Sequence, residues 1–343
     1  MSDSASLPWL AATIADEQPS DWHLTPGSAL RVRVEGRLRS VADLPVTDEI
    51  LSELKKRAPA ADDELDVVIS GTHRRFRLHW FTTRGRNAVV LRHIPVKPPT
   101  LESIQGLPPA FVTTMQKPQG LFLIGGATGS GKSTTLAAAL DRINRNGSAV
   151  IVTAENPIEF VHTACASSVI YQLAYGRDFT SWTDALKDAL RKDPDVIAIG
   201  ELRDPETIFT ALIAANTGHQ VFATVHGGDT TTILERVIST FPAGERQIIC
   251  AMLDGCLRAV LAQRFVNTAS GKRAVIFELL TATNATRATI RDNKLHQLAS
   301  VLAGGTAAGM QTFDYHIERL LGRRTITPAE ARNHHSRPDE IPN

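Results

Sequence analysis

The sequence predicts an α/β protein with two domains: a small N-terminal α/β domain and a larger domain built on a mostly parallel sheet. Three observations predict this class. A glycine-rich octet at residues 126–133 stands between an apolar run and a helical segment. From about residue 109, apolar strands alternate with helical segments, which is typical of a parallel sheet covered on both faces. A proline-rich stretch at residues 95–100 precedes this alternation and interrupts regular structure.

Composition sets limits on the class of protein. At 343 residues the chain is long enough for two domains and at least one large core. Its 37 lysines and arginines balance 36 acidic residues, so we expect no nucleic-acid partner. No apolar run approaches the roughly 18 residues that span a bilayer, and the N-terminus lacks the features of a signal peptide. We therefore expect a cytoplasmic protein that can dock on a membrane protein.

The N-terminal domain is expected to span residues 1–94. Residues 30–40 alternate between apolar and polar side chains around Glu35-Gly36, which predicts a strand pair with a hairpin turn. Residues 46–57 have helical spacing. Further strands are predicted at residues 66–70, 73–81 and 87–94. Residues 95–108 are expected to form the interdomain linker.

The second domain is expected to span residues 109–330. Its strands are predicted at residues 121–125, 149–153, 196–199, 220–224 and 274–279. Its helices are predicted at residues 132–146, 182–192, 205–216 and 230–240. A C-terminal helical region is expected at residues 244–265 and 287–321, with Cys250 and Cys256 as core residues of its apolar part. The polar residues 331–343 are expected to form a disordered tail.

The octet at residues 126–133 reads GATGSGKS and fits the phosphate-loop pattern of glycine, four residues, glycine, lysine and serine or threonine. Its glycines let backbone N–H groups converge on a phosphate, and the following helix N-terminus adds partial positive charge. Lys132 is expected to reach the β- and γ-phosphates, and the Ser133 hydroxyl to ligate Mg²⁺. The chain is therefore predicted to bind a nucleoside triphosphate. The residues expected to contact it are Gly126, Ala127, Thr128, Gly129, Ser130, Gly131, Lys132, Ser133 and Thr134.

Carboxylates follow two of the predicted strands. Glu201 comes directly after the apolar strand at residues 196–199, at the strand end where parallel sheets bind ligands. A carboxylate there can polarise an attacking water or hold a metal through water. Glu155 and Glu159 follow the strand at residues 149–153, and we expect Glu159 to be a further candidate metal ligand.

Histidines and arginines supply further candidates. His219 and His226 flank the strand at residues 220–224, and an imidazole at a strand end can hydrogen-bond a γ-phosphate. Arg75 and Arg77 alternate with apolar residues along the predicted strand at residues 73–81, so one strand face is basic. Arginine suits a triphosphate held across a domain interface, but a merely solvated strand face explains this pattern equally well.

Four segments in order carry a family resemblance: GATGSGKSTT, AENPIEFVH, ALRKDPDVIAIGELRDPETI and TGHQVFATVH. They resemble the Walker A, Asp-box, Walker B and His-box motifs of the secretion ATPase superfamily. Within it, the chain is most similar to the type IV pilus retraction ATPases, which drive twitching motility. The likeness runs from residues 19–24 to GMQTFD at residues 309–314 and so covers most of the chain.

The resemblance implies a homo-hexameric ring. Each subunit would combine a PAS-like N-terminal domain with a RecA-like ATPase domain and would bind ATP and Mg²⁺. The ring would act at the cytoplasmic face of the inner membrane on a platform protein of the pilus, beside an extension ATPase or a paralogue. The site residues that the resemblance implies are Glu201 as the Walker B catalytic glutamate, Glu155 as the Asp-box glutamate, His226 as the residue facing the γ-phosphate with His219 beside it, and Arg77 and Arg92 as N-terminal arginines that reach the nucleotide.

The chain departs from this family at three places. Asn156 replaces the usual aspartate of the Asp box, which removes one negative charge. A segment that usually reads Gln-Arg-Glu is Gln172-Leu-Ala. The retraction signature AIRNLIRE is matched by ATRATIRD, which keeps Arg287, Ile290 and Arg291. Two alternatives therefore stay open: a type IV secretion or conjugation ATPase of the same superfamily, and a regulatory paralogue that binds nucleotide with little turnover.

Overall fold

The computed structural model describes residues 7, 9–10, 13, 19–34, 36–58, 62–69, 72–95, 97–165 and 167–342. The chain forms two compact units, Met1–Lys97 and Pro98–Asn343. Among the residues described, none of the helices combines the length and the apolar character needed to span a bilayer.

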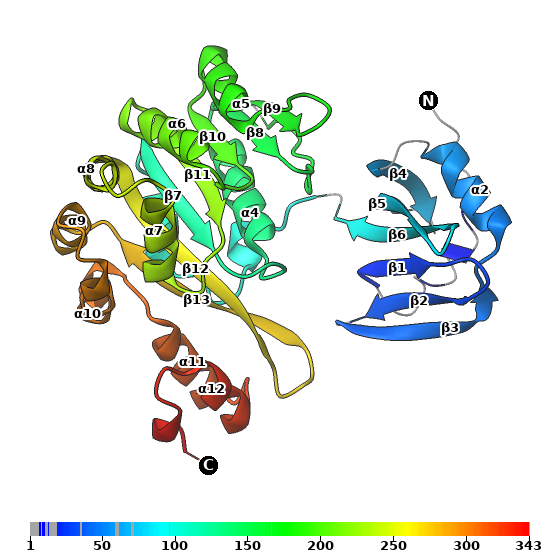
Figure 1. Cartoon of the computed structure of the whole chain (residues 1–343). Helices are drawn as coiled ribbons and strands as arrows, with labels where there is room; N and C mark the ends of the chain where they lie inside the picture. Colours follow the sequence, from blue (N-terminus) through cyan, green and yellow to red (C-terminus); the bar gives the residue numbers. More distant parts are fainter. Residues whose placement is uncertain are drawn as a thin grey trace. The chain divides into compact units, whose positions relative to one another are not determined.

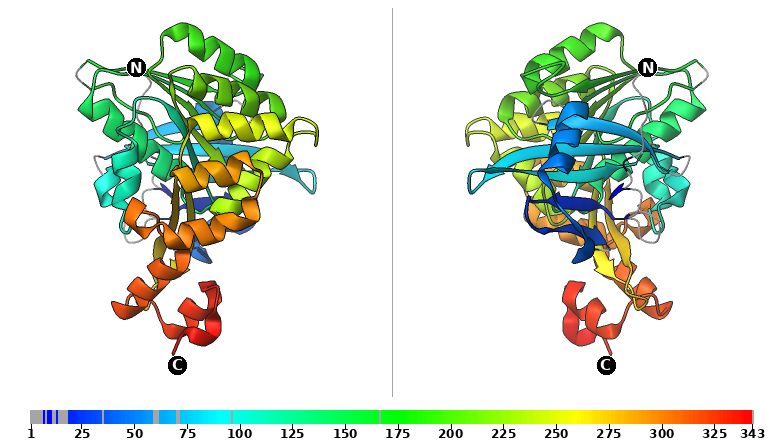
Figure 2. Two further views of the ribbon diagram at one scale, coloured as in Figure 1. Left: turned by 90° about the vertical axis from the view of Figure 1, so that its left-hand side faces the viewer. Right: turned by 90° about the vertical axis from the view of Figure 1, so that its right-hand side faces the viewer.

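The first unit contains a six-stranded sheet with the order β3-β2-β1-β6-β5-β4, in which every neighbouring pair is antiparallel. Helix α2 (Asp48–Arg57) lies across one face of this sheet (Figure 2) and buries Leu51 and Leu54. The strands are β1 (Asp21–Leu24), β2 (Ala29–Val34), β3 (Arg37–Pro45), β4 (Asp62–Ile69), β5 (Thr72–Thr83) and β6 (Arg86–Ile94).

Along the strands of the first sheet, buried apolar side chains alternate with more exposed ones, so one face of the sheet is apolar. Trp22 and Phe76 are buried on the apolar face, and their rings meet edge to face with centroids 5.3 Å apart, a favourable aromatic geometry. The alternation at residues 30–40 predicts an antiparallel pair, and β2 and β3 form it, with Val34 opposite Arg37. Glu35, expected in the turn between them, lies outside the described residues.

The second unit contains a seven-stranded sheet with the order β13-β12-β7-β11-β10-β8-β9. All neighbouring pairs are parallel except β12 with β13. The predicted α/β class with a mostly parallel sheet is thereby confirmed. The strands are β7 (Gly120–Gly125), β8 (Val150–Glu155), β9 (Val169–Ala174), β10 (Val196–Ile199), β11 (Gln220–Val225), β12 (Leu257–Asn267) and β13 (Arg273–Thr281).

Helices cover both faces of the second sheet (Figure 1). On one face, α3 (Pro109–Thr114) and α4 (Lys132–Asn146) pack over an apolar cluster, in which the rings of Phe122 and Phe222 stack with centroids 4.7 Å apart. The other face is covered by α5 (Trp182–Ala189), α6 (Pro205–Asn216), α7 (Thr230–Ser239) and α8 (Arg246–Cys256). The predicted core residues Cys250 and Cys256 are buried in α8.

One expected helical segment is a strand. Residues 257–265 belong to β12, whereas the helical region was expected to continue through residue 265. The segment reads LRAVLAQRF and is mostly apolar, a pattern that fits a buried strand as well as a helix. β12 lies between β7 and β13 and pairs with both, and residues 259–262 are fully buried. A backbone with neighbours on both edges needs hydrogen-bond partners in both directions, which a strand provides and a helix does not.

The end of the chain also differs from the expectation of a disordered tail at residues 331–343. Helix α12 (Pro328–His334) and a short 3-10 helix, Pro338–Glu340, follow α11 (Phe313–Gly322) and are folded as far as Pro342; Asn343 lies outside the described residues. Ala331 and Ile341 are buried, and the Ser336 N–H donates to the Asp314 carboxylate at 2.9 Å. The segment is polar overall, and its two buried apolar side chains are too few to produce a recognisable pattern in the sequence.

The C-terminal helices α11 and α12 pack against the β12–β13 hairpin (Figures 1 and 2). His316 of α11 makes this contact and is 1% exposed. Its Nδ1 accepts a hydrogen bond from the Phe277 N–H at 3.0 Å and lies 3.1 Å from the Gln311 Nε2. Burial, reinforced by the charge of Arg319, lowers the pKa of His316 to about 4. The remaining helices of this region are α9 (Asn284–Arg291) and α10 (Leu298–Gly304).

His316 predicts a pH-dependent stability. In the unfolded chain a histidine titrates near pH 6.5, and in the folded protein the pKa is about 4. Between these values only the unfolded state binds the proton, so the free energy of unfolding falls as pH drops through this window. We expect a loss of about 2 kcal/mol between pH 7 and pH 5 from this residue.

Urea denaturation of the full chain at both pH values measures this loss. His316→Asn keeps a hydrogen-bond acceptor but not the titration, so its stability should change less between pH 7 and pH 5 than that of the wild type. His296→Asn, at an exposed position, is the matched control and should keep the wild-type pH dependence. An equal pH dependence in wild type and His316→Asn would contradict the assignment.

Candidate functional site

The parallel strands of the second unit bring their carboxyl ends to one edge of the sheet. β7 leads into residues 126–133, and α4 begins at Lys132 (Figure 1). The tip of this loop, residues 127–129, is exposed, whereas Ser130 is buried. Gly131, the N-cap of α4, has a φ of 90°, a left-handed conformation that favours glycine. The predicted strand, loop and helix are therefore present, and the first N–H groups of α4 open into the loop.

Lys132 lies over this loop. Its Nζ donates to the carbonyl oxygens of Gly126 and Ala127, both at 3.0 Å. Burial lowers the pKa of Lys132, while the charges of Glu201 and Glu159 act in the opposite direction. The Lys132 ammonium group is held at the loop by these two hydrogen bonds. It is placed to exchange backbone carbonyls for the more strongly attracting oxygens of a phosphate.

Glu201 follows β10 and has two partners. Its Oε1 lies 2.9 Å from the His226 Nε2, and its Oε2 accepts a hydrogen bond from the Arg203 guanidinium at 2.5 Å. The Glu201 side chain is 17% exposed, so water reaches it only in part. Arg203 was not among the predicted site residues. Its position two residues after Glu201, in the same loop, was the signal in the sequence that could have found it.

The two histidines lie at opposite ends of β11. His226 follows the strand and belongs to the edge that carries the loop. Burial, followed by the charge of Lys132, lowers the pKa of His226, so the imidazole is neutral at neutral pH and can donate from Nε2 to Glu201. His219 precedes the strand, and its carbonyl oxygen accepts from the Gly120 N–H at the start of β7.

The expectation that His219 lies beside His226 is therefore wrong for this subunit. The six residues of β11 separate the two by roughly 20 Å, because a strand rises about 3.3 Å per residue. His219 instead contacts the end of α6, with Nδ1 3.1 Å from the Ala214 carbonyl oxygen. The physical reason is that residues flanking a strand are near in sequence but stand at opposite edges of a sheet.

Glu155 ends β8 at the same edge as the loop. Its carboxylate accepts from the Thr153 hydroxyl at 2.6 Å and from the Gln172 Nε2 at 3.1 Å. Burial is the main cause that raises its pKa, and the nearby charge of Glu159 adds to it. Gln172, the one residue of its segment that keeps the family pattern, is thus the partner of Glu155. Asn156, where the family has aspartate, is exposed.

Oxygen donors suited to a magnesium ion are present at this edge. Ser133 is the second residue of α4. The charges of Glu201 and Glu159 act to raise the pKa of the adjacent Lys132, so both carboxylates lie near the start of this helix. Hydroxyl and carboxylate oxygens are the ligands that Mg²⁺ prefers. Within the described part of the chain, no group of three His, Cys, Asp or Glu side chains could hold a metal ion by itself. This donor set suits an ion that shares its coordination with phosphate and water.

Arg77 and Arg92 belong to the first unit. They stand directly opposite each other on β5 and β6, on the same face of the sheet. Arg92 donates to the Asp21 carboxylate at 2.7 Å, and its side chain is 69% exposed. The register also places Glu64 of β4 opposite Arg77, so acidic residues occupy the positions on either side of the two arginines. Guanidinium groups are suited to contact an anionic group.

The three signature residues of α9 have different surroundings. Ile290 is fully buried in the core. Arg287 donates to the carbonyl oxygens of Asp254 and Leu257 at the end of α8, where basic side chains stabilise helix C-termini. Arg291 is 56% exposed and lies 3.5 Å from the Asp254 carboxylate. Of the three, only Arg291 is free enough to contact another molecule.

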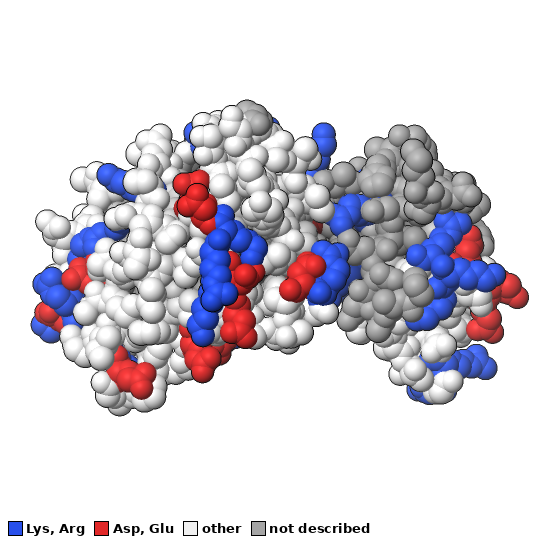
Figure 3. All heavy atoms as spheres, turned by 90° about the horizontal axis from the view of Figure 1, so that it is seen from above, with Lys and Arg blue, Asp and Glu red and all other residues white. Residues whose placement is uncertain are grey.

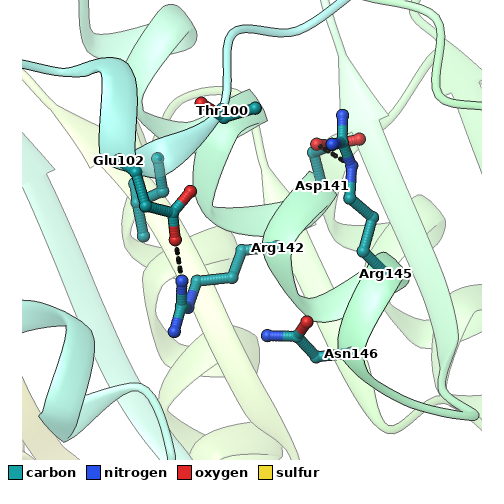
Figure 4. Close-up of a pocket in the computed structure, with 7 residues that line it drawn as sticks. Thr100, Glu102, Asp141, Arg142, Arg145 and Asn146 are labelled. Carbon is teal, nitrogen blue, oxygen red and sulfur yellow. Dashed lines mark hydrogen bonds and ion pairs between the residues drawn. The ribbon is translucent and has the colours of Figure 1, made fainter.

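A shallow hollow beside α4 is separate from this site. It lies along the second half of the helix, away from the loop at its start (Figure 4). Both arginines that line it are paired, Arg142 with Glu102 and Arg145 with Asp141. On the face of the molecule drawn in Figure 3, acidic and basic side chains of the second unit likewise lie next to each other. The hollow therefore offers no uncompensated charge to a ligand.

Comparisons with known proteins agree with this geometry. A twitching motility protein of Neisseria gonorrhoeae is 44% identical over 259 residues, which cover 75% of this chain and 69% of that protein. The type IV pilus retraction ATPase PilT of Pseudomonas aeruginosa is 36% identical over 334 residues, covering 94% of this chain and 96% of that protein. The crystal structure of a pilus retraction motor PilT with bound ADP superposes with a TM-score of 0.85 at 33% identity and covers 98% of this chain and 99% of that one.

The family profile gives the same result. The profile described as type II/IV secretion system protein matches residues 10–298, which contain the loop, the strand-end glutamates and His226. The chain therefore belongs to the family of type II/IV secretion system proteins.

Proposed function

We propose that this chain is a motor ATPase that hydrolyses ATP and uses the energy to retract a type IV pilus in twitching motility. The observation that carries the proposal is the meeting of Lys132, Glu201 and His226 at one edge of the sheet. The similarity to a pilus retraction ATPase over nearly the full length of both chains supports the type of work.

The roles of the side chains follow from their chemistry. The N–H groups of the loop and the Lys132 ammonium bind the β- and γ-phosphates. Glu201 orients and deprotonates the attacking water once its carboxylate leaves Arg203 or His226. His226, a neutral donor, then hydrogen-bonds the γ-phosphate. Glu155, whose pKa is raised by burial, is a second proton acceptor near the site. Ser133, with Glu159 or Glu201 through water, would hold Mg²⁺, which neutralises phosphate charge when bound.

The assembly is part of the proposal. A homo-hexamer, with Arg77 and Arg92 as nucleotide contacts, would transmit the conformational change to a platform protein at the cytoplasmic face of the inner membrane. The chain divides into two compact units after residue 97, and residues 98–108, expected in the linker at 95–108, belong to the second unit, where Leu101 is buried. Two compact units suit such a motor, because rigid domains can rotate about the segment that joins them. An extension ATPase or a paralogue is a further expected partner.

Lys132→Ala should weaken nucleotide binding by roughly 10- to 100-fold, because charge-assisted hydrogen bonds to the phosphates are lost. Titration of the full chain with fluorescent ADP and Mg²⁺ measures the affinity. Lys187→Ala, on the exposed face of α5, removes the same charge elsewhere and should leave the affinity unchanged. Wild-type affinity in Lys132→Ala would refute the role of this lysine.

Glu201→Gln should lower ATP hydrolysis by about 100-fold or more, because general-base catalysis is lost, while nucleotide binding persists. Steady-state phosphate release by the assembled oligomer measures it, with Glu206→Gln at an exposed position of α6 as control. Absence of hydrolysis from the wild type would favour the alternative of a regulatory paralogue that only binds nucleotide. Hydrolysis at the wild-type rate in Glu201→Gln would refute the role of Glu201 as general base.

The two signature arginines should behave differently. Arg287→Ala removes hydrogen bonds to the end of α8 and should lower the free energy of unfolding by about 1–3 kcal/mol. Arg291→Ala breaks long ion pairs to Asp254 and Asp292, at 3.5 and 4.0 Å, so stability should change by less than about 1 kcal/mol, with hydrolysis intact but twitching impaired. Thermal unfolding, phosphate release and a surface-motility assay together distinguish them. Normal motility with Arg291→Ala would exclude this residue from coupling.

A further inference from the structure

Gln263 of β12 is a buried side chain for which the chemistry above has no role. It is 1% exposed, and its Nε2 donates to the Ser130 carbonyl oxygen at 2.6 Å. The loop also approaches Gln263 at two glycines. A Cβ at Gly131 would lie 3.1 Å from the Gln263 Nε2, and a Cβ at Gly126 would lie 2.5 Å from the Gln263 carbonyl oxygen. Gln263 therefore contacts the phosphate loop near its first residue, Gly126, and again at Ser130 and Gly131.

The contact between Gln263 and Ser130 orients a peptide plane. The peptide bond that joins Ser130 to Gly131 is planar and trans, so its N–H points in the direction opposite to its C=O. Because Gln263 holds the carbonyl toward β12, the Gly131 N–H is directed to the other side of the loop. That N–H stands at the N-cap of α4, where the backbone donors of a phosphate site begin.

The strand that carries Gln263 is a rigid support. Gln263 pairs with Phe277 of β13, and the preceding residue Ala262 pairs with Gly125 at the end of β7. β12 is therefore hydrogen-bonded on both edges at the point where the loop leaves the sheet. A donor on such an element is held in place before the ligand arrives, which reduces the cost of binding.

The site also contains buried oxygens without partners. The Oε1 of Gln263 and the hydroxyl of Ser130 are buried and form no hydrogen bond. An unpaired buried polar atom costs free energy, and an apolar side chain of the same length at position 263 would avoid that cost. The presence of an amide at position 263 is therefore explained by the hydrogen bond from its Nε2 to the Ser130 carbonyl oxygen.

We propose that Gln263 is a positioning residue for the nucleotide: it holds the Ser130 peptide so that the Gly131 N–H and the start of α4 face the phosphates. Gln263 touches the loop and not the reacting atoms. The proposal rests on the proposed function of the loop as a phosphate site.

The test compares two buried glutamines. Gln263→Met keeps the length of the side chain and removes the donor. The matched control is Gln220→Met, because Gln220 is 5% exposed and its Nε2 donates to the Met115 and Lys117 carbonyl oxygens at the opposite edge of the same sheet. Affinity for N-methylanthraniloyl-ADP with Mg²⁺, the KM for ATP and the urea midpoint are measured for the full chain.

We expect Gln263→Met to weaken ADP binding roughly tenfold, the equivalent of one hydrogen bond, and to raise the KM in proportion. Gln220→Met should lower the urea midpoint and leave the affinity unchanged. Gln263→Glu, which presents an acceptor to the Ser130 carbonyl with almost no change in volume, should weaken binding at least as much and serves if the Met variant does not fold.

Two results would overturn the proposal. Wild-type ADP affinity in Gln263→Met and Gln263→Glu, alongside lost affinity in Lys132→Ala, would exclude the positioning role and leave the proposed function standing. An equal loss of affinity in Gln220→Met would show that lowered stability, and not the loop contact, is the cause. A wild-type chain that binds no ADP would refute the proposed function itself.

Discussion

The parallel pairing of β7, β11, β10 and β8 is the constraint on which the site depends. In these strands the carboxyl ends lie at one edge, so the residues that follow each strand meet although they are far apart in sequence. Lys132, Glu155, Glu201 and His226 are brought together in this way. The pairing is stable because each strand is buried on both faces, between the cluster beneath α3 and α4 and the larger cluster beneath α5 to α8.

Partial burial strengthens the electrostatic interactions among the charged groups at this edge. Lys132, Glu201 and His226 are shielded from much of the solvent, so they influence one another more strongly than they would in water. The charges of Glu201 and Glu159 oppose the lowering of the Lys132 pKa by burial, and the positive charge of Lys132 adds to burial in lowering the pKa of His226. Glu201 is shared between Arg203 and His226. A change in either contact therefore alters the environment of the carboxylate that is proposed to activate water.

The neighbouring strands β12 and β13 support both sides of the site. Gln263 of β12 contacts the phosphate loop. Glu278 of β13 accepts from the backbone N–H and the hydroxyl of Thr230, both at 2.9 Å, at the start of α7 and close after His226. These side chains lie on opposite faces of one strand pair, because Gln263 is paired with Phe277 and Glu278 with Ala262. The C-terminal helices pack on the same hairpin, so they are connected to the site through two hydrogen-bonded strands.

The sequence by itself determined the α/β class, the phosphate loop and the strand-end residues Glu155, Glu201 and His226, because these depend on local patterns: apolar runs, helix spacing and a loop motif. Only the tertiary structure decided that His219 stands at the far edge, that residues 257–265 are a strand, and that Gln263 and Arg203 join the site. Each of these depends on which segments become neighbours. A mostly apolar segment is compatible with backbone hydrogen bonds inside a helix and with hydrogen bonds to adjacent strands. The pairing of β12 with β7 and β13 decides for the strand.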